Sequence, residues 1–313
     1  MLNRALKQVN TVAIGGHIRP DGDCVGSCMG LYQYIQKCYP NISVDVYLEE
    51  IPDCFHMFEI TKEIVHEVTE EKEYDLFIAL DCGDANRLGF SSILFEKAKK
   101  TLCVDHHISN QAFADENYIV PEASSTAELV YRLIDKEQIN TDIAECLYLG
   151  IVHDTGVFQY SSTAPETMEA AADLMRKKIR ANEIIDKTYY EKTYAQNQIL
   201  GKALLDSELV LDGKCIVSCL SDEVMKSFGV KPKDLEGIVS QLRVTKGVEV
   251  AVFLYELKED EYKVSLRASG DVNVSKIAEY FGGGGHVKAA GVTIKGSAQT
   301  VINGLVEQIQ LQL

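Results

Sequence analysis

The chain has 313 residues, of which 46% are hydrophobic and 25% are charged, and its net charge is −16. This composition predicts a folded protein of about two domains rather than a disordered chain. The acidic total excludes a protein that coats long DNA or RNA, since such binding depends on a basic surface. The first residues, MLNRALKQVN, lack the features of a signal peptide, and no apolar run reaches the ~20 residues needed to span a bilayer. We therefore expect a cytoplasmic protein with no membrane association.

Up to about Lys187, short apolar runs alternate with amphipathic segments, which predicts an α/β domain with a doubly wound, mainly parallel sheet. The predicted strands are TVAIGG from Thr11, SVDVYL from Ser43, YDLFIAL from Tyr74 and TLCV from Thr101. The predicted helices are Cys24 to Lys37, SSTAELVYRLIDK, Thr141 to about Asp154, and APETMEAAADLMRKK.

The pattern changes after residue 187. Residues 188–206 predict a polar-rich helical connector, and residues 207–313 predict a second, smaller α/β domain across a cleft. Its predicted elements are the strands CIVSCL, EVAVFLYEL and YKVSLRAS and the helices DLEGIVSQLRV and AQTVINGLVEQIQLQL. We assign residues 1–187 to the first domain.

The nine cysteines include no C-x-x-C pair and no zinc-ribbon spacing. Most lie in apolar segments, so we interpret them as buried free thiols in a reducing compartment. This context also disfavours a thiol-based regulator.

Acidic and histidine residues gather in four clusters, three of them just beyond predicted strands and the fourth near the end of a predicted helix. A single aspartate there is usually a turn residue, and a single histidine is usually structural. Four clusters are harder to dismiss, because ligands bind beyond the carboxyl ends of the strands of an open parallel sheet. The clusters are His17, Asp21 and Asp23 in GHIRPDGDCVGS; Asp81 in DCGD; Asp105, His106 and His107 after TLCV; and Asp154 in GIVHDTGVF. His56 and His66 stand alone, and His153 points away from Asp154 on a helix, so we exclude these three from the ligands.

Carboxylates and imidazoles together suit divalent ions of the manganese type. The candidates Asp21, Asp23, Asp81, Asp154, His17 and His106 are many for one ion but suit two ions that share a carboxylate. Two ions about 3.5–4 Å apart form the usual clamp for phosphoryl chemistry, in which a hydroxide attacks phosphorus in line.

Four aspartates and two divalent ions nearly cancel in charge, so an anionic substrate needs further positive groups. His107, Arg267, His286 and Lys288 could supply them. The glycines of GGGGH would let backbone N–H groups approach a phosphate. A flexible hinge is the alternative interpretation of these glycines, and the spacing is not that of a Walker loop.

His106 and His107 are adjacent. Side chains alternate along an extended chain, so we expect the two rings to face opposite sides. His106 would then turn to the metal ions and His107 to the scissile phosphate, with Asp105 orienting an imidazole from outside the ligand set.

These motifs resemble a known family. HIRPDGDCVGS, DCGD, VDHH and HDTGVF, in this order, resemble the motif series of the DHH phosphoesterases, and VSLRASGDVNVSKIAEYFGGGGHVKAAG resembles their DHH-associated C-terminal domain. The resemblance covers nearly the whole chain and is greatest to the nanoRNase and pAp-phosphatase group. His153 departs from it, because relatives often have threonine there. Gly22 also departs, and we expect it only to loosen the loop.

The resemblance implies two Mn²⁺ ions, with Mg²⁺ or Co²⁺ as substitutes in vitro. It implies that His17 and Asp21 hold one ion, that Asp23, His106 and Asp154 hold the other, and that Asp81 bridges them. His107 would be the catalytic contact to the phosphate. The substrate's nucleotide or terminal phosphate would bind Arg267, Gly283, Gly284, Gly285 and His286 across the cleft.

The expected function is a metal-dependent phosphoesterase that trims short oligonucleotides to mononucleotides or dephosphorylates pAp. The expected partners are short oligonucleotides or small nucleotides, not long duplexes, and the protein could be a homodimer. Alternatives are a phosphodiesterase for cyclic dinucleotides or their linear products, an inorganic pyrophosphatase, which the GGGGH segment disfavours, and a catalytically silent nucleotide sensor, which the full ligand set disfavours.

Overall fold

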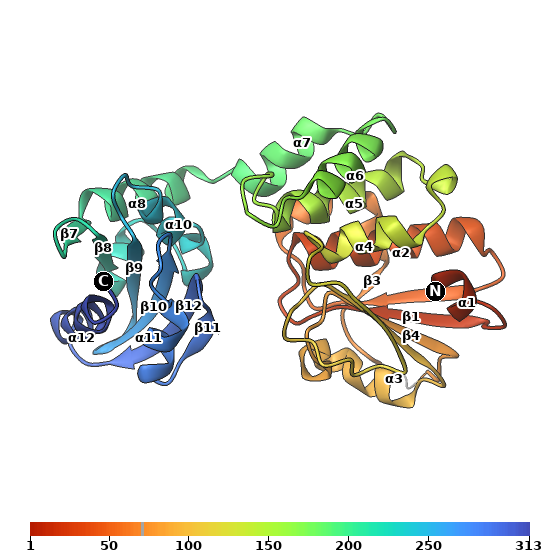
Figure 1. Cartoon of the computed structure of the whole chain (residues 1–313), viewed down its shortest axis with the longest axis horizontal. Helices are drawn as coiled ribbons and strands as arrows, with labels where there is room; N and C mark the ends of the chain where they lie inside the picture. The colour runs from red at the N-terminus through yellow and green to blue at the C-terminus, as the bar shows by residue number, and fades with distance from the viewer. Residues whose placement is uncertain (70–71) are drawn as a thin grey trace. The chain divides into compact units, whose positions relative to one another are not determined.

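The computed structural model describes residues 1–69 and 72–313, which form two compact units, Met1–Glu191 and Lys192–Leu313. Figure 1 shows one sheet in each unit. Among the described residues, none of the helices combines the length and the hydrophobicity that crossing a membrane requires.

The first unit contains a six-stranded sheet of order β3-β2-β1-β4-β5-β6, and every pairing in it is parallel. Its strands are β1 (Thr11–Gly15), β2 (Ser43–Tyr47), β3 (Ile64–Val65), β4 (Leu76–Leu80), β5 (Thr101–Asp105) and β6 (Glu116–Ile119). Its helices are α1 (Leu2–Ala5), α2 (Gly22–Cys38), α3 (Ser92–Lys97), α4 (Thr126–Leu133), α5 (Thr141–Asp154), α6 (Pro165–Met175) and α7 (Ala181–Ile185). The predicted doubly wound α/β fold is confirmed.

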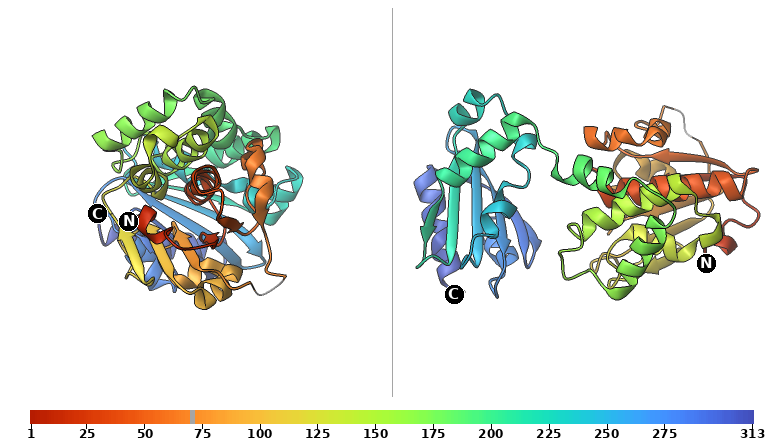
Figure 2. Two further views of the ribbon diagram at one scale, coloured as in Figure 1. Left: turned by 90° about the vertical axis from the view of Figure 1, so that its right-hand side faces the viewer. Right: turned by 90° about the horizontal axis from the view of Figure 1, so that it is seen from above.

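Helices cover both faces of this sheet. Helices α2, α4 and α5 pack together over one face, and α3 lies on the other (Figures 1 and 2). Strand β4 is therefore buried along its whole length: Ile78 and Leu80 point into the core beneath α2, while Phe77 and Ala79 point into the core beside α3. This explains why its sequence is apolar without alternation.

The topology of the sheet creates a binding position. From β1 the chain builds outward through β2 and β3, and then returns to place β4 on the other side of β1. In such a sheet, ligands bind beyond the carboxyl ends of the strands where the order reverses. The residues that follow β1 and β4 lie at this point.

The second unit has a six-stranded sheet of order β11-β12-β10-β9-β8-β7, in which only β8 and β9 pair in parallel. Its strands are β7 (Glu208–Val210), β8 (Cys215–Leu220), β9 (Val250–Lys258), β10 (Glu261–Ala268), β11 (Gly284–His286) and β12 (Ala289–Lys295). Its helices are α8 (Tyr194–Leu205), α9 (Asp222–Ser227), α10 (Ile238–Arg243), α11 (Val274–Tyr280) and α12 (Ala298–Gln310).

Two segments of this unit differ from the sequence interpretation. Helix α8, which we expected as part of a connector, packs Ile199 and Ala203 into the second unit's core beside Ile216. The glycine segment is neither a hinge nor only a turn, because Gly284 to His286 pair with β12 as strand β11.

Candidate metal centre

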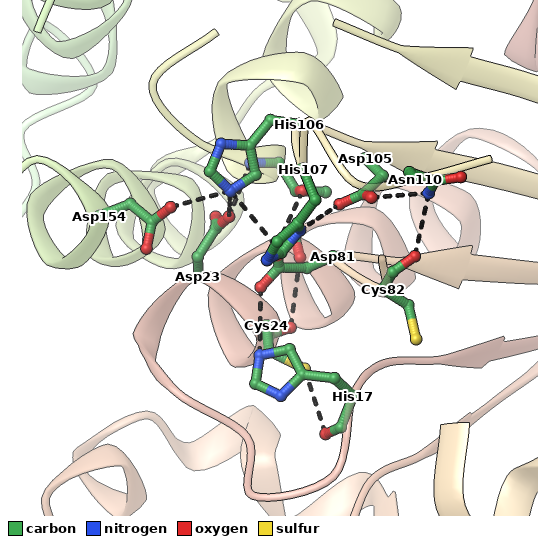
Figure 3. Close-up of polar contacts among 12 residues, drawn as sticks. His17, Asp23, Cys24, Asp81, Cys82, Asp105, His106, His107, Asn110 and Asp154 are labelled. Carbon is green, nitrogen blue, oxygen red and sulfur yellow. Dashed lines mark hydrogen bonds and ion pairs between the residues drawn. The ribbon is translucent and has the colours of Figure 1, made fainter. Parts of the chain in front are cut away.

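Asp81 lies at the middle of the site (Figure 3). It follows β4 with a φ of 55°, a left-handed conformation that aspartate tolerates better than most residues. Its side chain is buried, and its two oxygens face different imidazoles: Oδ2 lies 3.4 Å from His17 Nε2, and Oδ1 lies 3.6 Å from His106 Nε2. Asp81 is thus shared by two sets of neighbours.

His17 and Asp21 form the first set. Asp21 is the N-cap of α2, and its Oδ1 accepts hydrogen bonds from the backbone N–H groups of Asp23 and Cys24. Its Oδ2 lies 3.6 Å from His17 Nε2. His17 Nδ1 lies 2.8 Å from the carbonyl oxygen of Ile18 and donates to it, so Nε2 is the nitrogen that faces the carboxylates.

Asp23, His106 and Asp154 form the second set. His106 Nε2 lies 3.0 Å from Asp154 Oδ2 and 3.9 Å from Asp23 Oδ2. Asp23, in the first turn of α2, also accepts hydrogen bonds of 2.6 and 2.8 Å from the N–H groups of Thr126 and Ala127 at the start of α4. The helix terminus therefore fixes the direction of this carboxylate.

The electrostatics of the cluster favour a bound cation. Burial, together with the charges of Asp81 and Asp154, raises the pKa of Asp23 well above its usual value. Burial and the charge of Asp81 also raise the pKa of Asp154, although His106 opposes this. Crowded, buried carboxylates repel one another unless positive charge lies between them, and oxygen and imidazole donors are those that hard divalent ions accept. The residues therefore fit the metal ions that the sequence predicts.

Among the described residues, three groups of side chains place their possible donor atoms within 4.8 Å of one another inside each group. The groups are His17, Cys24 and Asp81; Asp81, His106 and His107; and Asp23, His106 and Asp154. All six predicted ligands lie in the first unit and meet around Asp81. The sequence interpretation missed Cys24 as a neighbour of the site, although it directly follows Asp23 in the first turn of α2.

The two adjacent histidines do not face opposite sides. Their ring centroids lie only 5.0 Å apart, and His107 Nδ1 is 3.7 Å from Asp81 Oδ1. The expected alternation fails because strand β5 ends at Asp105, so both histidines lie beyond the extended segment.

A buried carboxylate orients His107. Asp105 Oδ1 lies 2.7 Å from His107 Nδ1, and Asn110 Nδ2 donates to Asp105 Oδ2 at 2.6 Å. The hydrogen bond from His107 to Asp105 raises the pKa of His107, against the effect of burial. This arrangement leaves Nε2 as the nitrogen of His107 available to another group.

The other candidate residues belong to the second unit. Arg267 in β10 and His286 in β11 are both register partners of Ala289 in β12. Directly paired residues of an antiparallel sheet place their side chains on the same face, so the guanidinium and the imidazole flank Ala289 on one face. Gly283 precedes β11, and Gly284 and Gly285 lie in it.

Metal binding should release protons. Burial lowers the pKa of His17, but the carboxylates of Asp21 and Asp81 outweigh this effect and raise that pKa to about 12. Burial also lowers the pKa of His106, but Asp154 and Asp23 outweigh it and raise that pKa to about 10. Both imidazoles are therefore protonated near neutral pH in the metal-free protein. Since a ligating imidazole must be neutral, we expect release of on the order of two protons and an affinity that rises with pH.

Calorimetric titration with Mn²⁺ in two buffers of different ionisation enthalpy measures this release. Asp23, whose pKa is raised, adds any proton that it holds. An apparent enthalpy that is the same in both buffers would contradict the prediction.

Comparison with known proteins identifies the family. Residues 11–151 match the sequence profile of the DHH family, N-terminal domain, and residues 212–312 match that of the DHHA1 domain. A bifunctional oligoribonuclease and PAP phosphatase from Thermus thermophilus is 30% identical over 91% of this chain and 84% of its own length. The chain belongs to the DHH family. Members of this family and its relatives hydrolyse phosphoesters, and this protein is an enzyme of that class.

Two further relatives support the DHH assignment. A bifunctional oligoribonuclease and PAP phosphatase from Bacillus subtilis is 26% identical over 94% of this chain and 92% of its own length. The crystal structure of an exopolyphosphatase-related protein from Bacteroides fragilis superimposes with a TM-score of 0.92 at 27% identity, covering 99% of this chain and 94% of that one. The two-domain DHH and DHHA1 fold is thus shared over nearly the full chain.

Proposed function

We propose that this protein is a two-metal phosphoesterase, using Mn²⁺, that hydrolyses short oligonucleotides to mononucleotides, dephosphorylates pAp, or does both. The observation that carries the proposal is the shared position of Asp81, whose two oxygens face the His17 side and the His106 side of one partly buried cluster. The relatives named as oligoribonucleases and PAP phosphatases support the substrate class.

The other five donors divide into two sets around Asp81. His17 and Asp21 would hold one ion, and Asp23, His106 and Asp154 the other. When bound, such ions lower the pKa of water and withdraw charge from phosphate oxygens. The chain itself fixes the donors, through the helix cap at Asp21 and the amides that hold Asp23.

His107 would contact the substrate phosphate. Asp105 fixes the orientation of its ring and favours the protonated form. A protonated imidazole can donate Nε2–H to a phosphate oxygen and stabilise the charge that develops there. Arg267 and His286 would bind the nucleotide or terminal phosphate of the substrate through their shared face of the second sheet.

A substrate panel tests the proposal. The enzyme is incubated with end-labelled oligoribonucleotides of two to six nucleotides, pAp and cyclic dinucleotides, each with Mn²⁺, Mg²⁺ or Co²⁺, and the products are separated. We expect mononucleotides from the dinucleotide, or phosphate from pAp, with the highest rate in Mn²⁺. Fastest cleavage of a cyclic dinucleotide would replace the proposed substrate, and metal binding without turnover of any phosphoester would refute the enzymatic role.

A further inference from the structure

His153 lies one residue before Asp154 and is in none of the donor groups, yet it touches the site from another direction. Its ring packs directly on Gly22, the first residue of α2, which lies between Asp21 and Asp23. A Cβ atom built on Gly22 would lie 2.2 Å from His153 Cγ and 2.6 Å from Cδ2 and Nδ1. No side chain fits between this ring and the helix.

Gly22 is thus needed for space. It lies in the first turn of an ordinary α-helix and does not have the positive φ that would itself demand glycine. The expectation that Gly22 only loosens the loop is therefore wrong: the residue is buried and helical, and its missing side chain admits the imidazole.

The imidazole is also held on its other sides. Phe55 and Tyr189 meet it edge to face, with ring centroids 5.3 and 5.6 Å away. His153 Nε2 lies 2.9 Å from Thr188 Oγ1, and Thr188 Oγ1 in turn donates to the carbonyl oxygen of Ile184 at 2.7 Å. Because the single hydroxyl proton goes to Ile184, Nε2–H of His153 is the donor to Thr188. The ring cannot retreat from Gly22 without breaking these contacts.

We propose that His153 is a positioning residue that, with Gly22, sets the spacing between the two helix ends that carry metal ligands. The start of α2 carries Asp21 and Asp23, and the end of α5 carries Asp154. The ring belongs to the second helix end, rests on the first, and is locked in place by Thr188, Phe55 and Tyr189. This inference rests on the proposed function, because the pair acts through the ligands.

The pair makes a reciprocal test possible. Alanine has a higher intrinsic helix propensity than glycine, so Gly22→Ala would be harmless or mildly stabilising if only the local helix mattered. If the pair sets the ligand spacing, the added methyl group instead pushes the helix ends apart. Loss of outer contacts that orient metal ligands typically costs 10- to 100-fold in metal affinity, and we expect a loss of about this size.

The experiment compares Mn²⁺ affinity, measured from the electron paramagnetic resonance signal of free Mn²⁺, in full-length wild type, Gly22→Ala and Gly22→Ala/His153→Ala. The double variant removes the clashing ring and should bind Mn²⁺ more tightly than Gly22→Ala, but less tightly than wild type, because it also lacks the contacts of His153. Gly83→Ala is the matched control near the site, because its Cβ would meet only ordinary contacts at 3.4 to 3.6 Å. Gly22→Ala/His56→Ala removes an exposed histidine and should recover nothing.

The outcomes separate this inference from the proposed function. Wild-type protein that binds no Mn²⁺ contradicts the proposed function. Wild-type protein that binds Mn²⁺, with Gly22→Ala equal to it or with the double variant no tighter than Gly22→Ala, overturns the pairing. If Gly22→Ala fails to fold, the inference is tested with the single variants Thr188→Val and His153→Ala, which keep Gly22. Weaker Mn²⁺ binding by either folded variant supports the inference. An Mn²⁺ affinity equal to that of wild type in both variants overturns it.

Discussion

Replacing Asp81 with alanine should abolish metal-dependent cleavage of a dinucleotide. Among the residues that the structure describes, Asp81 is the carboxylate whose two oxygens face both the His17 and the His106 side of the cluster. Its removal should therefore weaken both proposed metal positions at once. The loss in kcat/KM should exceed the roughly 10- to 100-fold that follows removal of an outer contact to a ligand. Initial rates over a range of Mn²⁺ concentrations measure the effect.

Two variants control this result. Asp81→Asn keeps the shape but removes the charge, and should also be inactive. Asp84→Ala removes an exposed carboxylate three positions along, which caps the following turn through Asn86, and should retain most of the activity. Cleavage by Asp81→Ala at a rate near that of wild type, still dependent on Mn²⁺, would refute the assignment of Asp81 as the shared ligand.

Replacing His107 with alanine should lower kcat while leaving Mn²⁺ affinity within a few-fold of wild type. His107 is assigned to the substrate phosphate, and loss of one donor to a developing oxyanion typically costs about 10²- to 10³-fold in kcat. The combination of an unchanged metal titration and a slow single turnover distinguishes a substrate contact from a metal ligand. This distinction matters because His107 Nδ1 also lies 3.7 Å from Asp81.

Asp105→Asn tests whether the hydrogen bond from His107 to Asp105 contributes to catalysis. The variant keeps the shape of the side chain but removes the charge beside His107 Nδ1. We expect kcat to fall by less than in His107→Ala, and combining the two substitutions should add little, since both act through the same imidazole. Parallel losses of Mn²⁺ affinity in Asp105→Asn and His107→Ala would instead place His107 among the ligands.

The sequence predicts the fold of the first unit well because the strongest local patterns also determine the topology. Alternating strands and helices indicate a parallel sheet, and three of the four candidate clusters follow its strands, which is why the candidate residues meet in the folded chain. Helix α5 occupies the predicted Thr141–Asp154, since a capping Asn140 precedes it. The edge strand β6 was missed because Glu116–Ile119 is half-buried and polar at its start, with no apolar run to indicate a strand.

The other predictions that the structure corrects depend on how the chain folds beyond the local pattern. Gly22 and His153 are 131 positions apart by their numbers, so local patterns cannot show that one leaves room for the other. The side-by-side rings of His106 and His107 depend on where β5 ends, which is less certain from sequence than the existence of the strand. The sequence predicts only a buried free thiol for Cys24, because its nearness to His17 and Asp81 arises only in the folded chain.

We propose that this chain binds two divalent ions in one partly buried cluster and needs both for phosphoester cleavage. Stoichiometric addition of Mn²⁺ to metal-free protein, with the initial rate of dinucleotide or pAp hydrolysis followed at each addition, tests it most directly. We expect little activity below one equivalent and full activity at two equivalents per chain. Full activity in excess chelator, or a plateau at one equivalent, would contradict it.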